Sequence, residues 1–336
     1  MVRVALIGFG GIAKAAHLGA YLTLEKEGKV KLVSVCDIDP KRFEEQIQLN
    51  IGTSDITLDE SVTKYTDWRE MLKNEDVDLV DICLPTFLHA ETAIEVLNMN
   101  YNVLCEKPMS LFYADCCKMV EAAKKSGKKF MIGQCLRFSN KYNYLKKLVA
   151  DKTYGEVKSA VFHRLSGPPV WGWDNWFMDY DRSHGCINDM HIHDIDIIRA
   201  IFGEPEAVSC CTQDVYAPKD LAHSTLLYPG YSVLAIGDWS QEGLPFSAEF
   251  RVGFDKATVC LANDTITIYP RGGEAFVADI EPDDFYFNEI KFFVENIESG
   301  EENTVNTPES AATSVKLIEK LIESSNNNGK FLSFEA

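Results

Sequence analysis

The sequence lacks several features that would assign it to common protein classes. It has no run of roughly 18 apolar residues, which a membrane-spanning helix requires, and no internal repeat or low-complexity segment. It also lacks a basic excess, because 33 Lys and Arg stand against 51 Asp and Glu, for a net charge of −18. Such a field repels phosphate backbones, so we expect neither a nucleic-acid nor a membrane partner.

The sequence is equally poor in ordered cysteine patterns. Its ten cysteines are irregularly spaced and include no C-x-x-C pair, and several lie in apolar runs, as Cys83 does. This pattern favours buried free thiols in a reducing compartment over disulfides. The chain opens directly on an apolar segment typical of a strand, so we expect no signal peptide and predict a cytoplasmic protein.

The first 133 residues alternate short apolar runs with segments of helical periodicity. The apolar runs are at 2–7, 31–36, 79–84, 102–105 and 129–132, and helical patterns between them include 90–98 and 113–125. Strands alternating with helices indicate a parallel sheet with helices on both faces. The sequence therefore predicts an α/β Rossmann domain over residues 1–133.

Residues 134–336 have a different pattern, with several β runs in succession. We expect a helix at 140–150, a strand at 157–165, a helix near 188–202, strands between 207 and 277, and two closing helices. This order predicts an α+β domain with a mainly antiparallel sheet. Alternating apolar residues such as Leu234 and Ile236 predict a broad exposed sheet face, and hence a homodimer or homotetramer.

A glycine-rich turn follows the first apolar run and predicts a dinucleotide site. Its residues are Gly8, Phe9, Gly10, Gly11 and Ile12. The glycines permit a tight turn and close approach to a pyrophosphate, and the helix that follows offers free N–H groups. Asp37, after the second strand, would bind ribose hydroxyls and repel a 2′-phosphate, which favours NAD over NADP. A purely structural strand–turn–helix is the alternative.

Two further groups of residues can supply acid–base chemistry. Lys107 follows an apolar strand and precedes Pro108, so it lies at the sheet edge where ligands bind. There it would stabilise developing negative charge on a substrate oxygen, unless it is simply a surface lysine. Asp189 and His193 are four residues apart on an expected helix, which suits a general acid/base pair, although a helix-capping aspartate and a core histidine would look the same.

A metal site competes for the second group. In a strand, Asp189, His191 and His193 would all face one way and could bind an ion. The apolar spacing of residues 187–202 favours a helix instead, on which His191 points away from the other two. We therefore expect no metal.

Together these residues resemble the Gfo/Idh/MocA family (glucose–fructose oxidoreductase, inositol dehydrogenase and rhizopine-catabolism proteins). The similarity covers nearly the whole chain, and its motifs are Gly8–Ala13, Cys36-Asp37, Leu84-Pro85-Thr86 with His89, Cys105–Pro108, Arg137-Phe138, Tyr154–Glu156 and Asp189-x-x-x-His193-x-x-Asp196. The separation between the Lys-Pro pair and the Asp-x-x-x-His motif is more specific than the glycine turn.

The resemblance implies a Rossmann domain followed by an open-sheet domain that binds substrate and mediates oligomerisation. It also implies NAD(P)-dependent oxidation or reduction of a sugar, cyclitol or related polyol. Lys107, Asp189 and His193 would form the catalytic set and contact the substrate, with further substrate contacts from Arg137 and Trp176. Cofactor contacts beyond the glycine turn and Asp37 would come from Pro85, Thr86, His89, Glu106 and Lys107. A dinucleotide-binding sensor without turnover and a metal-dependent hydrolase or lyase are the competing functions.

Overall fold

The structure is a computed structural model that describes residues 1–45, 48–49, 52–53 and 58–336. The chain divides into two compact units. The first comprises residues 1–135, 171–176 and 284–312, and the second comprises 136–170, 177–283 and 313–336. The sequence predicted a boundary between residues 133 and 134, with a last helix that could pack back on the first domain. The start of that helix, residues 308–312, falls in the first unit and the rest falls in the second.

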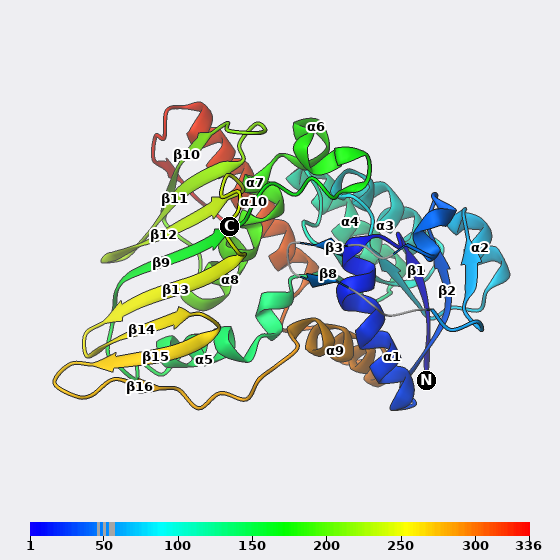
Figure 1. The fold of residues 1–336 in the computed structure, drawn as a ribbon, viewed down its shortest axis with the longest axis horizontal. Coiled ribbons are helices and arrows are strands. Elements are labelled where there is room, and N and C mark those ends of the chain that lie inside the picture. The colour runs from blue at the N-terminus through cyan, green and yellow to red at the C-terminus, as the bar shows by residue number, and fades with distance from the viewer. Residues whose placement is uncertain (46–47, 50–51, 54–57) are drawn as a thin grey trace. The chain divides into compact units, whose positions relative to one another are not determined.

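A six-stranded parallel sheet forms the centre of the first unit (Figure 1). In spatial order its strands are β5 (Thr63–Tyr65), β2 (Val30–Cys36), β1 (Val2–Ile7), β6 (Leu79–Ile82), β7 (Asn102–Glu106) and β8 (Phe130–Gly133). β1 and β6 are neighbours although they are far apart in sequence, so the winding of the sheet reverses between them. Ligands bind beyond the carboxyl ends of strands at such a reversal.

Helices of the first unit pack in pairs. The helical segments are η1 (Ala13–His17), α1 (Leu18–Lys26), η2 (Pro40–Phe43), α2 (Trp68–Asn74), η3 (Thr86–Leu88), α3 (His89–Asn98), α4 (Tyr113–Ser126) and α9 (Phe285–Ser299). α9 contacts α1 and η1, and α3 contacts α4. Gly127 ends α4 in the left-handed conformation, at the helix stop that the sequence predicted. A short antiparallel pair, β3 (Gln48–Leu49) and β4 (Gly52–Thr53), completes this unit.

The second unit is built on a nine-stranded sheet (Figure 1). In spatial order its strands are β16 (Phe276–Val277), β15 (Thr265–Pro270), β14 (Ala257–Ala262), β13 (Ser247–Phe254), β9 (Val157–Leu165), β12 (Tyr231–Asp238), β11 (Leu221–Tyr228), β10 (Ala207–Gln213) and β17 (Leu332–Ser333). β9 and β12 run parallel, and the other pairings among the described strands are antiparallel. The predicted fold class is thus confirmed for both units.

Of the helices that the structure describes, those of this unit pack on one face of the sheet and leave the other face uncovered. The helices are α5 (Asn140–Ala150), α6 (Tyr180–Ser183), α7 (Cys186–Asp189), α8 (His191–Phe202) and α10 (Pro308–Asn326), of which α10 begins in the first unit. α8 packs on β9 and β12, where Phe162 and Val233 are fully buried. Val161, Leu234 and Ile236 alternate with them and stay half-exposed on the opposite face.

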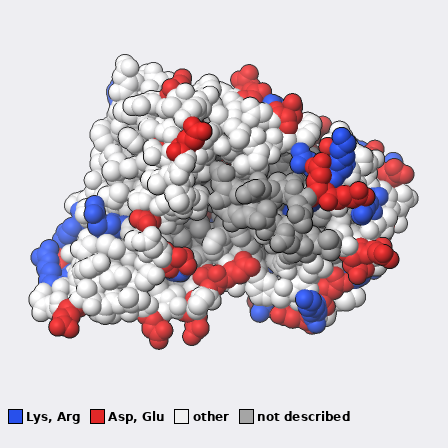
Figure 2. Space-filling view, in the orientation of Figure 1, with Lys and Arg blue, Asp and Glu red and all other residues white. Residues whose placement is uncertain are grey.

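The surface charge and the helices of the described residues agree with the composition. On the face shown in Figure 2, acidic and basic side chains are interspersed, and the coloured residues form no continuous basic surface. Across the described part of the chain, no helix combines the length and apolar character needed to cross a bilayer.

Candidate active site

Gly8 and Gly10, in the turn after β1, are glycine for different structural reasons. Gly8 has φ +90°, and a Cβ there would lie 2.6 Å from the Cys83 carbonyl oxygen, so the packing of the turn on the end of β6 requires glycine. Gly10 has no such φ, and no described atom lies within 4 Å of the position its Cβ would take. Contacts within the described residues therefore do not explain Gly10, and the space that they leave beside it fits the close approach of a dinucleotide phosphate.

Residues 11 and 12 already belong to the helix that continues into η1. The first N–H groups of a helix have no acceptor within it, so Gly11 and Ile12 are placed to bind an anion. The N–H of Phe9 is used differently, because it donates to Asp37 Oδ2 at 2.9 Å. A cofactor contact from Phe9 stays a prediction, and the structure gives its backbone the role of orienting Asp37.

Asp37 lies beside the turn, as the sequence predicted from its position after β2. Its second oxygen accepts from the Asp39 N–H at 2.9 Å, and burial raises the pKa of its carboxyl group. Two cationic side chains, Lys14 and Arg42, lie near Asp37 and bear on the choice between NAD and NADP. Lys14 has its amine over the Phe9 ring, and burial together with the Arg42 charge lowers the pKa of Lys14. Lys14 was not predicted as a site residue, since a single lysine in a helix carries no ligand signal.

Lys107 follows β7, and its backbone is held by the preceding residue. The Glu106 side chain folds back so that Oε2 accepts the Lys107 N–H at 2.9 Å, while Oε1 lies 2.9 Å from Nε2 of His17. Glu106 is buried, and its carboxylate is engaged within the protein. A cofactor contact from Glu106 stays a prediction.

The chain segments after β6 and β7 are joined by His89. Its ring is buried, with Nδ1 2.8 Å from the Pro108 carbonyl oxygen and Nε2 2.7 Å from that of Leu84. Burial lowers the pKa of His89, although the two carbonyl groups act in the opposite direction. Thr86 is also buried, in η3 beside Pro85. Contacts from these three residues to a cofactor stay predictions, and the structure adds a bridging role for His89.

The segment around Asp189 is two helices rather than the single helix that the sequence predicted. Asp189 is the last residue of α7, Met190 interrupts, and His193 lies in the first turn of α8. The i, i+4 relation on one continuous helix is therefore wrong. Asp189 is buried and His193 is half-buried, and both belong to the second unit. Lys107 belongs to the first unit.

His191 has a packing role in the second unit. Its ring is fully buried, and Nε2 lies 2.8 Å from Ser224 Oγ. A Cβ on Gly237 would lie 2.8 Å from the Cβ of His191. Burial lowers the pKa of His191 to about 3, so the ring is neutral. The metal hypothesis needed a strand here, and the segment is helical.

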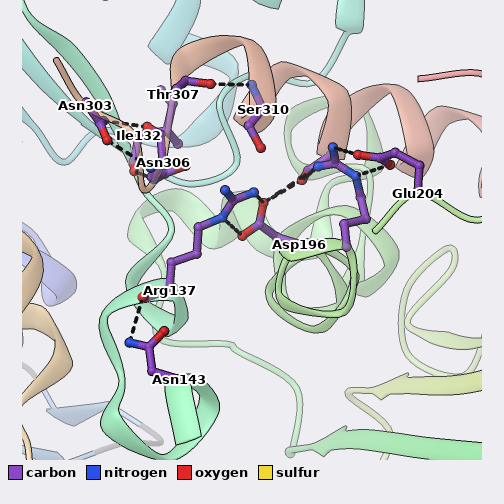
Figure 3. Close-up of polar contacts among 11 residues, drawn as sticks. Ile132, Arg137, Asn143, Asp196, Glu204, Asn303, Asn306, Thr307 and Ser310 are labelled. Atoms are coloured by element: carbon purple, nitrogen blue, oxygen red, sulfur yellow. Dashed lines mark hydrogen bonds and ion pairs between the residues drawn. The ribbon is translucent and has the colours of Figure 1, made fainter. Parts of the chain in front are cut away.

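Arg137, a predicted substrate ligand, forms a buried ion pair. Its Nε and Nη2 bond the two oxygens of Asp196 at 2.7 and 2.8 Å, and Ser314 Oγ donates to the same carboxylate at 2.6 Å (Figure 3). Arg164 and Asp194 form a second buried pair. Acidic residues in an otherwise apolar helix signal such pairs, because a buried carboxylate needs a partner. Substrate contacts from Arg137 and from Trp176, which is buried in η5 (Trp173–Met178), stay predictions.

Family models match both halves of the chain. Residues 2–134 match the oxidoreductase family with an NAD-binding Rossmann fold, GFO/IDH/MocA, and residues 142–259 match the GFO/IDH/MocA C-terminal domain. The chain is 28% identical over 216 residues to 2,7-anhydro-N-acetylneuraminate hydratase of Escherichia coli, covering 62% of this chain. That alignment spans 52% of the hydratase, about half of its length. The chain is also 28% identical to myo-inositol 2-dehydrogenase of Thermotoga maritima, covering 70% of this chain and 74% of the other.

Solved structures share the fold over the whole chain. The WlbA dehydrogenase of Bordetella pertussis, in complex with NADH and UDP-GlcNAcA, has a TM-score of 0.82 at 19% identity, covering 100% of this chain and 99% of that one. An aldose-aldose oxidoreductase of Caulobacter crescentus, complexed with glycerol, has a TM-score of 0.83 at 21% identity, covering 99% of both chains.

Proposed function

Because the chain belongs to the GFO/IDH/MocA oxidoreductase family, we propose that it is an NAD(P)-dependent oxidoreductase of sugars, cyclitols or related polyols. The observation that carries the proposal is the space at Gly10 that the described residues leave open, beside a helix start and at the switch point of the parallel sheet. Relatives named myo-inositol 2-dehydrogenase and inositol 2-dehydrogenase support the substrate class.

The bound nicotinamide supplies hydride transfer to or from the carbon that carries the reacting hydroxyl. In the proposed reaction His193 takes the hydroxyl proton when the alcohol is oxidised and returns it when the ketone is reduced. Asp189 supports the charged imidazole, and Lys107 stabilises negative charge on the reacting oxygen. Asp37 binds the ribose hydroxyls, which favours NAD over NADP, whereas the nearby Lys14 and Arg42 set how strictly a 2′-phosphate is rejected.

A second candidate is a net addition of water to a sugar derivative. It is favoured by two relatives named 2,7-anhydro-N-acetylneuraminate hydratase, from Escherichia coli and from Mediterraneibacter gnavus. A dinucleotide-binding sensor without turnover is the third. In each case we expect a cytoplasmic protein, consistent with ten cysteines that are all free thiols.

The decisive experiment is a screen of polyols, sugar acids and 2,7-anhydro-N-acetylneuraminate with NAD and with NADP. A dehydrogenase accumulates one reduced nicotinamide per product. A hydratase forms product without net nicotinamide reduction, and a sensor binds nicotinamide without forming any product. Lys107→Ala is the control, since it should strongly lower turnover in the first case while nicotinamide still binds. Product formation by Lys107→Ala at the wild-type rate would contradict the proposed role of the lysine.

A further inference from the structure

A buried cluster of charged side chains lies beneath the sheet edge in the first unit. At its centre is His17, the last residue of η1, which is fully buried. Its Nδ1 lies 2.6 Å from Asp81 Oδ2 on β6, and its Nε2 lies 2.9 Å from Glu106 Oε1 at the end of β7. The Tyr21 hydroxyl donates to Asp81 at 2.9 Å, and Cys83 Sγ lies 3.6 Å from His17 Nδ1.

Both ring nitrogens of His17 face carboxylate oxygens, so both must carry hydrogen to bond them. The ring is therefore the imidazolium cation. Burial alone would lower the pKa of His17, but the Asp81 carboxylate and the Cys83 sulfur outweigh it and raise that pKa well above its ordinary value. For Glu106, burial acts to raise the pKa of the carboxyl group, and the bond to His17 more than reverses this. A charged histidine between two carboxylates accounts for both directions.

The donor atoms of His17, Asp81 and Cys83 lie within 4.8 Å of one another, as in a metal site. The shortest separation argues against an ion in this arrangement. Two ligands of a tetrahedral zinc ion, each about 2 Å from it, are roughly 3.3 Å apart, whereas the His17 nitrogen and the Asp81 oxygen are 2.6 Å apart. That separation is the length of a charge-assisted hydrogen bond.

The cluster reaches Lys107 through one carboxylate. Glu106 Oε2 accepts the Lys107 N–H at 2.9 Å, and the ring of His17 holds the other oxygen from the opposite side. Gly133 on β8 leaves the room for this, because a Cβ there would lie 3.2 Å from Glu106 Oε1. The orientation of the Glu106 carboxylate, and with it the peptide plane before Lys107, is thus fixed by two donors.

We propose that His17, itself held by Asp81, is a positioning residue that clamps Glu106 and thereby fixes the backbone from which Lys107 projects. His17 lies in the helical segment that follows the glycine turn and continues into α1, so the clamp links the cofactor-binding end of β1 to the lysine at the end of β7. The catalytic consequence of the clamp rests on the proposed function of Lys107, whereas the clamp itself does not.

The first test needs no substrate. Hydrogen exchange of the segment 104–109 is measured by mass spectrometry in wild type, His17→Gln and Tyr21→Phe. Tyr21→Phe is the matched control, because Tyr21 is equally buried and bonds Asp81 but not Glu106. We expect roughly tenfold faster exchange in the segment for His17→Gln, since an amide held by a charged acceptor loses its protection. Equal exchange in His17→Gln and Tyr21→Phe would overturn the clamp.

The second test is a double-mutant cycle with NAD and the polyol that turns over in the screen. His17→Gln should lower kcat about 10–100-fold, the usual effect of a displacement near 1 Å, with NAD affinity little changed and Tyr21→Phe close to wild type. In the Lys107→Ala background, His17→Gln should lower kcat no further. An equal loss in both backgrounds would mean that His17 acts on the fold in general, and would refute the positioning role.

Two outcomes separate this inference from the proposed function. If Lys107→Ala retains full kcat, the proposed role of the lysine fails, while the hydrogen-exchange result still decides whether the clamp exists. If His17→Gln does not fold, Glu106→Gln replaces it, because the amide oxygen still accepts one bond but carries no charge to pair with His17. Slow exchange and full kcat in Glu106→Gln would overturn the inference.

Discussion

Gly8 and Gly10 are two residues apart but have different roles, one in packing and one in the proposed binding of the cofactor, and mutation can separate the two. Gly8→Ala should lower the free energy of unfolding by about 2–4 kcal/mol, because the new Cβ would meet the Cys83 carbonyl in a backbone conformation that alanine rarely adopts. Gly10→Ala should leave the unfolding temperature unchanged but weaken NAD binding roughly tenfold, about 1.4 kcal/mol, since the methyl group enters open space that the phosphates would use. Thermal unfolding and calorimetric NAD titration measure the two effects, and unchanged NAD affinity in Gly10→Ala would count against the site.

His193 carries the proposed proton transfer, so His193→Ala should lower turnover about 10²–10⁴-fold with NAD affinity unchanged. His191→Ala is the comparison, because His191 is a buried neighbour that contacts Ser224 and the sheet. It should destabilise the second unit more than it affects turnover. Steady-state kinetics and NAD titration on both variants decide this, and a larger loss of turnover in His191→Ala would contradict the assignment.

The charged state of His17 has a consequence for stability against pH. Its pKa is raised in the folded protein, so above pH 6.5 the unfolded chain has released a proton that the folded protein still holds. The contribution of His17 to stability is therefore complete below pH 6.5 and is lost as the pH rises towards the folded pKa. Urea unfolding from pH 6 to 9 should show wild type losing up to about 1.4 kcal/mol per pH unit relative to His17→Gln. Parallel curves for the two proteins would show that His17 is neutral.

At the residue scale, the sequence predicted site residues that follow the ends of strands, but it did not predict the buried cluster of charged side chains around His17. Gly10, Asp37 and Lys107 each follow an apolar run, which is a local signal. The His17 cluster depends on β1, β6 and β7 being brought side by side, which no local spacing reveals. The available signal was Asp81, a charged residue inside a buried strand, since such a group needs a partner.

At the element scale, most strands and helices follow the predicted pattern. The exceptions are a helix break that does not disturb the apolar spacing and two short elements. Helical periodicity runs through residues 187–202, so the interruption at Met190 was not visible in the sequence. β5 and α2 were also missed. β5 is three residues long and mostly exposed, and so has little apolar pattern. The long strand over 157–165 and the helix over 140–150 match their predicted bounds.

The junction between α8 and the sheet depends on a glycine in β12. A methyl group on Gly237 would come within 2.8 Å of the His191 Cβ, so Gly237→Ala should destabilise the protein by about 1–3 kcal/mol, the usual cost of overpacking. Gly273→Ala is the control, because its Cβ would touch only Pro270, at 3.5 Å. Combining Gly237→Ala with His191→Gly, which removes that Cβ, should restore part of the loss, and strictly additive unfolding free energies would rule out this contact.

At the scale of the whole molecule, the composition predicted two domains but not their membership. Residues 171–176 and 284–312 belong to the unit that begins at Met1, although residues 136–170 separate the first of these segments from residue 135 and a longer stretch separates the second. α9 packs on α1 and η1 through side chains that are ordinary for any amphipathic helix. Which sheet such a helix covers is decided by tertiary packing, so its sequence alone could not assign it.

The uncovered face of the nine-stranded sheet predicts the state of assembly. Val161 is paired with Leu234 in the register of β9 and β12, and Ile236 lies on the same face, so the three half-exposed side chains form a continuous apolar strip. A stable interface buries about 800 Å² per partner and excludes unpaired charge from its centre. We therefore expect a homodimer or homotetramer through this face, and a shift to monomer in Leu234→Glu.

Val215→Glu provides the matched control, because Val215 is an exposed apolar residue in the loop after β10 rather than on the sheet face. It gains the same charge and should keep the wild-type assembly. Sedimentation or light scattering at micromolar concentration measures the mass, and circular dichroism verifies that each variant is folded. A monomeric wild type would contradict the prediction, and so would a Leu234→Glu variant that keeps the wild-type mass, since a carboxylate buried without a partner at the centre of an interface costs several kcal/mol.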